Sequence, residues 1–178
     1  FLENESHDLL PEKDFVAKII AARDAKQNND FMIIARTEAL IAGLGVKEAI
    51  NRANAYETAG ADALLIHSKQ KNTDEIFEFT DSWQGNIPLV VVPTAFPNAK
   101  LKDLSEHKIR IVIYANQTLR SAHSSMSNIL KKIKDEKLHE VENEMSSMED
   151  IFKLQKTYSI EEKEKEIEKE LKKLGYIT

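Results

Sequence analysis

The stretch FMIIARTEALIAGLG, residues 31–45, decides the fold, because a short apolar run leads directly into a polar end and a glycine-containing loop. The run is apolar without alternation, which is typical of a strand that a parallel sheet buries on both faces. Arg36 ends this run, and in ADALLIHSK, residues 61–69, His67 ends a second one. These are either ordinary strand ends that reach solvent, or two strands that bring cationic side chains to one anion site.

Strand and helix patterns alternate through the first two-thirds of the chain. Apolar strands are expected to begin near residues 31, 62, 88 and 109, and a stretch with helical spacing of apolar residues follows each of them. Repeated βα units form either an open doubly wound sheet or a (β/α)₈ barrel, of which four units are half. The sequence therefore predicts an α/β fold.

Composition limits the classes of function. The chain has 178 residues, of which 42% are hydrophobic and 31% charged, as in a soluble globular domain. No apolar stretch approaches the roughly 18 residues that span a bilayer, so no membrane partner is expected. The absence of cysteine removes disulfides and thiolate chemistry from this chain and leaves the redox compartment open, with the cytoplasm as the default. A net charge of −5 argues against nucleic acid, whose binding depends on Lys and Arg.

The C-terminal region differs from the rest of the chain. Residues 156–178 include the charged segment IEEKEKEIEKELKKLG, and Ser159 and Glu162 have the spacing of a capping box at its start. The apolar stripe of this expected helix is narrow, so the helix is either mostly solvated or packs on another subunit. We expect two parts, residues 1–155 and this charged helix.

Polar residues are expected at the carboxyl ends of all four strands, where the loops of a parallel α/β fold converge on the ligand. Arg36 offers a planar fork for a carboxylate or phosphoryl group, and His67 can donate a hydrogen bond and change protonation near neutrality. Thr94 and Asn116 can hydrogen-bond without adding charge. The alternative is structural: Arg36 pairs with Glu38, and the other three residues form turns and local hydrogen bonds.

Other site signals are missing. No Walker or GxGxxG loop, HExxH or EF-hand motif is present, and no acidic cluster is expected at the strand ends, so no metal ligand is assigned to this chain. His7, His107, His123 and His139 are expected to be surface residues.

The segments around the four polar residues resemble a known family. ARTEALIAGLG, AYETAGADALLIHSK, PLVVVPT and YANQTLRSA are similar to the phosphoenolpyruvate mutase group of the isocitrate lyase/phosphoenolpyruvate mutase superfamily. The resemblance runs from about residue 12 to Gln155. Lyases of the superfamily typically have Glu where this chain has His67. The family often has Asn-His where this chain has Asn116-Gln117.

The resemblance implies a (β/α)₈ TIM-type barrel, of which residues 1–155 supply roughly the last four βα units, followed by C-terminal helices. It implies an isomerase of phosphonate biosynthesis that interconverts phosphoenolpyruvate and phosphonopyruvate, and that is active only when the N-terminal half of the barrel completes it. Arg36 and His67 are implied to be catalytic, and to bind the small anionic substrate together with Thr94 and Asn116.

The same resemblance implies Mg²⁺ as cofactor, with its ligands in the N-terminal half, and a cytoplasmic homo-oligomer (dimer or tetramer). Three alternatives stay open. The protein could be a phosphonopyruvate hydrolase, a C–C lyase of the same superfamily, or a non-catalytic half-barrel that binds a partner.

Overall fold

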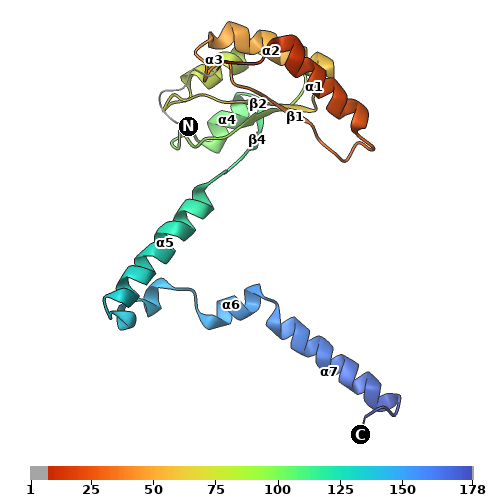
Figure 1. The fold of residues 1–178 in the computed structure, drawn as a ribbon, viewed down its shortest axis with the longest axis vertical. Helices are drawn as coiled ribbons and strands as arrows, with labels where there is room; N and C mark the ends of the chain where they lie inside the picture. The colour runs from red at the N-terminus through yellow and green to blue at the C-terminus, as the bar shows by residue number, and fades with distance from the viewer. Residues whose placement is uncertain (1–7, 178) are drawn as a thin grey trace. The chain divides into compact units, whose positions relative to one another are not determined.

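The computed structural model describes residues 8–177, which fall into two compact units with a boundary between Gln117 and Thr118. The first unit contains α1 (Glu12–Ala25), β1 (Ile34–Thr37), α2 (Gly45–Ala59), β2 (Ala63–Ile66), α3 (Asp74–Ser82), β3 (Leu89–Val91), α4 (Leu101–Glu106) and β4 (Ile109–Val112) (Figure 1). The second contains α5 (Gln117–Lys134), η1 (Leu138–Glu140), η2 (Glu142–Glu144), α6 (Met148–Leu154) and α7 (Thr157–Lys173), α5 beginning at the boundary residue. Across the described residues, no helix is both long enough and apolar enough to cross a membrane.

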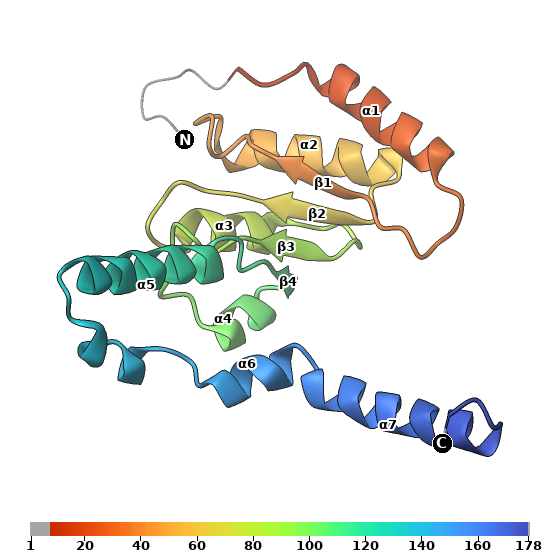
Figure 2. The ribbon, with the colours of Figure 1, turned by 60° about the horizontal axis from the view of Figure 1, so that its bottom comes forward.

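The four strands form one parallel sheet in the order β1-β2-β3-β4 (Figure 2). Each strand is connected to its neighbour through a helix, and right-handed crossovers that always step in the same direction place those helices on one side. A doubly wound sheet would reverse its strand order, and no reversal occurs among these four strands. The predicted α/β fold is confirmed, and the arrangement is that of four consecutive units of a (β/α)₈ barrel.

The two faces of the sheet are packed differently. One face carries the main core, where strand side chains such as Leu64 and Ile66 meet buried side chains from α1, α2, α3 and α4. The opposite face has a small cluster built only from residues on or next to the strands. Its buried members are Ala63, Leu65 and Val90, and its partly buried members are Val92, Ile111 and Ile113. We call this opposite side the strand-only face.

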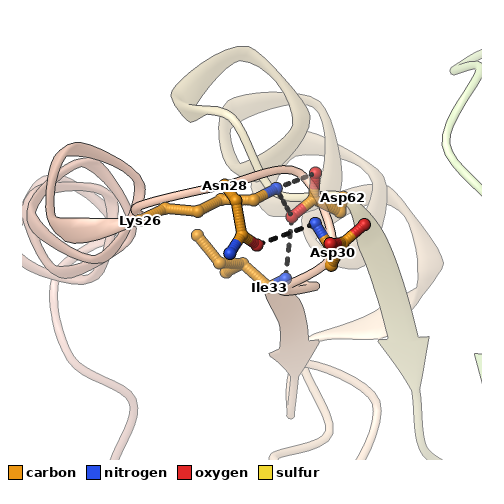
Figure 3. A network of polar contacts seen from close by, with 5 residues as sticks. All are labelled: Lys26, Asn28, Asp30, Ile33 and Asp62. Carbon is orange, nitrogen blue, oxygen red and sulfur yellow. Dashed lines mark hydrogen bonds and ion pairs between the residues drawn. The ribbon is translucent and has the colours of Figure 1, made fainter.

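A network of hydrogen bonds and an ion pair connects the segments that precede β1 and β2 (Figure 3). Lys26 Nζ lies 3.0 Å from both carboxylate oxygens of Asp62, and the backbone N–H of Ile33 donates to Asp62 Oδ2 at 2.8 Å. The backbone hydrogen bond, and then Lys26, lower the pKa of Asp62 because both favour its charged form. This network ties the loop before β1 to the loop before β2.

The C-terminus of α2 and the N-terminus of α7 differ in how they are capped. Gly60 ends α2 with φ 101°, a left-handed conformation that suits glycine. The predicted capping box at Ser159 is wrong, because α7 begins earlier, at Thr157, and Lys156 stands in the N-cap position. Ser159 lies inside the first turn, and its hydroxyl donates to the Lys156 carbonyl at 2.8 Å. A hydroxyl that bonds back to the preceding turn cannot cap the helix.

The helices of the second unit leave their apolar stripes exposed within the described residues. Neither α5 nor α7 contains a buried residue. The exposed apolar residues of α7 are Tyr158, Ile160, Ile167 and Leu171. The narrow apolar stripe expected from the sequence is present on α7, and no other part of the described chain covers it.

Candidate active site

Arg36 lies near the carboxyl end of β1, in register with Leu65 of β2. Partners in a parallel pair point to the same side, so Arg36 belongs to the strand-only face with Leu65. Its Nε forms an ion pair with Glu38, as the sequence alternative suggested. The Arg36 Nε atom is buried, and Glu38 is the charged partner that it meets among the described residues. The Arg36 side chain as a whole is 40% exposed.

His67 is the first residue after β2 and is half-buried. Strand alternation places it on the same face as Leu65, and therefore on the face of Arg36. Burial lowers the pKa of His67 first, the positive charge of Arg36 lowers it further, and Glu38 opposes the shift. The effect of Arg36 indicates that the two side chains share one electrostatic environment. A lowered pKa favours the neutral imidazole, which still has one N–H to donate.

Thr94 and Asn116 follow β3 and β4 at the same edge of the sheet. The Thr94 hydroxyl oxygen and the Asn116 Oδ1 atom are buried, and neither has a hydrogen-bond partner among the described residues. A buried polar atom without a partner is costly, and most such atoms in proteins are satisfied. Unsatisfied groups at a strand-end edge are therefore available to a ligand.

The two edges of the sheet contrast in their polar contacts. At the amino edge, Asp62 satisfies Lys26 and the Ile33 N–H, whereas at the carboxyl edge Thr94 and Asn116 keep unsatisfied oxygens. In barrels of this type the carboxyl edge carries ligands, and the amino edge contributes stability. All four sequence candidates lie at the carboxyl ends, and the register of β1 and β2 places Arg36 and His67 on the same face of the sheet.

The site also contains a residue that sequence reasoning missed. Ser68, next to His67, is fully buried, and its hydroxyl donates to Glu75 Oε2 of α3 and accepts from the Gln70 N–H at 3.0 Å. A serine after a strand is common in loops, so nothing in the sequence singled it out.

The other histidines do not join this edge. The expectation for His107 is wrong in part, because its ring stacks on Phe77 at 3.8 Å and lies 3.2 Å from both Thr80 Oγ1 and Asp81 Oδ1. His123 and His139 are exposed as predicted, and His7 lies outside the described residues.

The described side chains offer no cluster of metal ligands. Within residues 8–177, no group of three or more His, Asp or Glu side chains is arranged to hold a metal ion. The described residues therefore do not fit a magnesium site.

The fold defines a segment of a (β/α)₈ barrel, and the four polar residues lie at the carboxyl ends of its strands. Residues 2–134 match the family model described as phosphoenolpyruvate phosphomutase, and the chain belongs to that family.

Relatives with known activities point to more than one reaction. The phosphonopyruvate hydrolase of Variovorax sp. (strain Pal2) is 46% identical over 150 residues, which are 83% of this chain and 52% of the relative. The phosphoenolpyruvate phosphomutase of Tetrahymena pyriformis is 39% identical over 155 residues, 86% of this chain and 52% of the relative. The chain thus spans about half the length of the curated relatives it matches.

Solved structures agree with the fold. A phosphonopyruvate hydrolase in complex with oxalate and Mg²⁺ is similar with a TM-score of 0.81 and 42% identity, covering 90% of this chain and 58% of that one. A phosphoenolpyruvate phosphomutase from Streptomyces platensis subsp. rosaceus reaches a TM-score of 0.88 at 35% identity, covering 93% of this chain and 58% of that one. The barrel architecture and the superfamily are therefore established.

Proposed function

We propose that the protein containing this chain is a phosphoenolpyruvate phosphomutase, which interconverts phosphonopyruvate and phosphoenolpyruvate. The observation that carries the proposal is the carboxyl edge of the sheet. There Arg36 shares an electrostatic environment with His67, and Thr94 and Asn116 offer buried polar atoms without partners. A dianionic or trianionic substrate would accept hydrogen bonds from the Thr94 hydroxyl and, once the Asn116 amide is flipped, from its NH₂ group.

In the proposed reaction the C–P bond of phosphonopyruvate breaks and an O–P bond forms at the former ketone oxygen. The electron pair of the C–P bond becomes the carbon–carbon double bond of the enol, so no proton is exchanged with solvent. Phosphoryl transfer with a loose transition state needs charge stabilisation and positioning more than covalent help from the protein.

Each side chain has a role that suits its environment. Arg36 would exchange its ion pair with Glu38 for a charge-assisted contact to a phosphoryl or carboxylate oxygen. Neutral His67 would donate one hydrogen bond without adding a second full charge next to Arg36. The Thr94 hydroxyl can donate by rotation, and the Asn116 amide can present its NH₂ by a flip, since its O and N atoms are interchangeable in shape.

We further propose that the active protein needs a segment beyond these 178 residues. β1 pairs only with β2 among the described strands, and Phe31, Met32 and Ile34 around its start are exposed. An exposed apolar edge strand invites pairing with another strand. A preceding half-barrel would cover this edge and the strand-only face, and would supply the ligands of a proposed Mg²⁺ cofactor, to which no step on this chain is assigned.

A phosphonopyruvate hydrolase is the second candidate, and the 46% identity to such an enzyme favours it. In that reaction the C–P bond breaks, water supplies a hydroxyl to phosphorus, and the enolate carbon gains a proton, giving phosphate and pyruvate. The four residues suit both reactions, because both require the phosphoryl group to be held while the C–P bond breaks. A C–C lyase and a non-catalytic half-barrel lack such a specific observation.

The test is to supply phosphonopyruvate and Mg²⁺ to the complete protein and to this chain alone, and to follow the products by ³¹P NMR. We expect phosphoenolpyruvate from the complete protein and no turnover by the chain alone. Phosphate and pyruvate as first products would favour the hydrolase. Turnover by residues 1–178 alone would contradict the need for a further segment.

A further inference from the structure

We propose that Ser68 and Glu75 form a positioning pair that holds His67 in its place at the carboxyl edge, an inference that rests on the proposed function for its catalytic consequence. Ser68 is 0% exposed, although its hydroxyl is polar and it lies at a strand end. Burial of a hydroxyl is tolerated when its hydrogen bonds are made within the protein.

The hydroxyl of Ser68 both donates and accepts a hydrogen bond. It donates to Glu75 Oε2, and it accepts from the Gln70 backbone N–H at 3.0 Å. The bond to a carboxylate is charge-assisted and therefore stronger than one between neutral groups. The bond from Gln70 closes a local turn, so the backbone directly after His67 is fixed to its own loop and to α3.

The adjacent residues His67 and Ser68 face opposite sides of the sheet. Leu64 and Ile66 pack with the helices, and continuing that alternation places Ser68 on the helix side, where it reaches α3. His67 then lies on the strand-only face with Leu65 and Arg36. An anchored Ser68 therefore limits how far the backbone of His67 can rotate or shift.

Such an anchor matters because the loop from β2 to α3 spans residues 67–73 and otherwise has exposed positions such as Lys69 and Gln70. Misplacing a reacting group by about 1 Å can cost roughly a hundredfold in rate. A buried hydrogen bond beside His67 would prevent such a displacement without touching the substrate.

The experiment compares Ser68→Ala and Glu75→Ala with a matched control, Glu78→Gln, in the complete protein. Glu78 is an exposed acidic residue of the same helix. The first measurement is the pH titration of the His67 ring by ¹⁵N NMR, which does not depend on which reaction the protein catalyses. The second is kcat and KM with phosphonopyruvate.

We expect both test variants to move the His67 titration toward that of an ordinary histidine, and to lower kcat about tenfold with a smaller change in KM. The double variant should be no worse than either single one, because both remove the same contact. Ser68→Thr, which keeps the hydroxyl, should restore part of kcat. The control should titrate and turn over like the wild type.

A His67 titration that both variants leave unchanged would overturn the proposal. If Ser68→Ala fails to fold, Glu75→Ala decides, because Glu75 is only partly buried near the start of α3. A protein that turns over neither phosphonopyruvate nor phosphoenolpyruvate would refute the proposed function. In that case the NMR titration would still decide whether the pair positions His67.

Discussion

Arg36 and His67 end neighbouring parallel strands on the same face of the sheet, and the pKa of His67 is lowered by burial and then by the charge of Arg36. The first consequence concerns protonation. The lowered pKa favours a neutral His67 near physiological pH, so this edge carries the guanidinium of Arg36, which is paired with Glu38, beside a neutral hydrogen-bond donor. This combination can hold an anion without the repulsion of two adjacent cations.

The charge of Arg36 should matter more for activity than for stability. We expect Arg36→Ala to lower kcat/KM about 100-fold, since an anion contact in the transition state contributes about 3 kcal/mol. The free energy of unfolding should change by less than about 1 kcal/mol, as for other exposed ion pairs. Kinetics and urea unfolding measure the two effects, with Arg110→Ala, an exposed strand arginine, as control. A strongly destabilised Arg36→Ala protein would make Arg36 a structural residue.

The lowered pKa of His67 predicts a pH dependence of stability. Between its pKa in the folded protein and its ordinary value of 6.5, the unfolded chain binds more protons at this residue than the folded protein does. The stability associated with His67 is therefore complete above about pH 6.5 and is lost as the pH falls toward the folded pKa. His67→Gln should gain stability relative to the wild type between pH 7.5 and 5 in urea unfolding. A difference that stays constant over this range would show that the pKa is not lowered.

Replacing Asp62 should lower the stability of the protein and leave its activity unchanged. Asp62→Asn weakens the contacts to Lys26 and the Ile33 N–H, and because the side chain is 34% exposed we expect a loss of only about 1 kcal/mol. The pKa of Asp62 is lowered, so its contribution is present above the ordinary value of 3.8 and disappears as the pH falls through the folded pKa. The variant and wild type should thus converge in stability in acid, while KM at neutral pH stays unchanged.

Asp24→Asn provides the control for Asp62, because Asp24 is an exposed partner of its sequence neighbour Arg23. This substitution should change the free energy of unfolding very little at every pH. A change in KM on replacing Asp62 would show that the amino edge influences the ligand site. That result would contradict the view that the amino edge contributes to stability alone.

The helix α7 is proposed to pack on another subunit, because its apolar stripe is exposed within the described chain. Deleting residues 159–178 from the complete protein should lower the molar mass measured by light scattering from that of an oligomer. Replacing Ile160 and Ile167 together by Ser should have the same effect, whereas Glu161→Gln should not. An unchanged mass in both variants would show that α7 is a solvated helix.

Much of the fold follows from the order of apolar runs. Strands expected near residues 62, 88 and 109 begin at Ala63, Leu89 and Ile109. The first strand begins at Ile34 rather than near residue 31, because the apolar residues Phe31 and Met32 remain exposed outside the ladder. When a strand is apolar on both faces, its sequence does not reveal at which residue the pairing with the next strand begins.

The candidate site was predictable only in outline. The positions of Arg36 and His67 follow from strand ends, but their coupling requires the register of two strands. The Ser68–Glu75 contact joins residues of a loop and a helix that no periodicity relates. The capping signal at Ser159 failed because the same hydroxyl has a competing backbone acceptor within one turn.

The most direct test of the anion site is a crystal structure of the complete protein equilibrated with phosphonopyruvate. We predict that a phosphoryl or carboxylate oxygen lies within about 3.2 Å of the Arg36 guanidinium, with Thr94 or Asn116 donating to the same ligand. An anion bound elsewhere, with Arg36 still paired to Glu38 and the Thr94 and Asn116 side chains far from the ligand, would contradict the assignment of this edge as the active site.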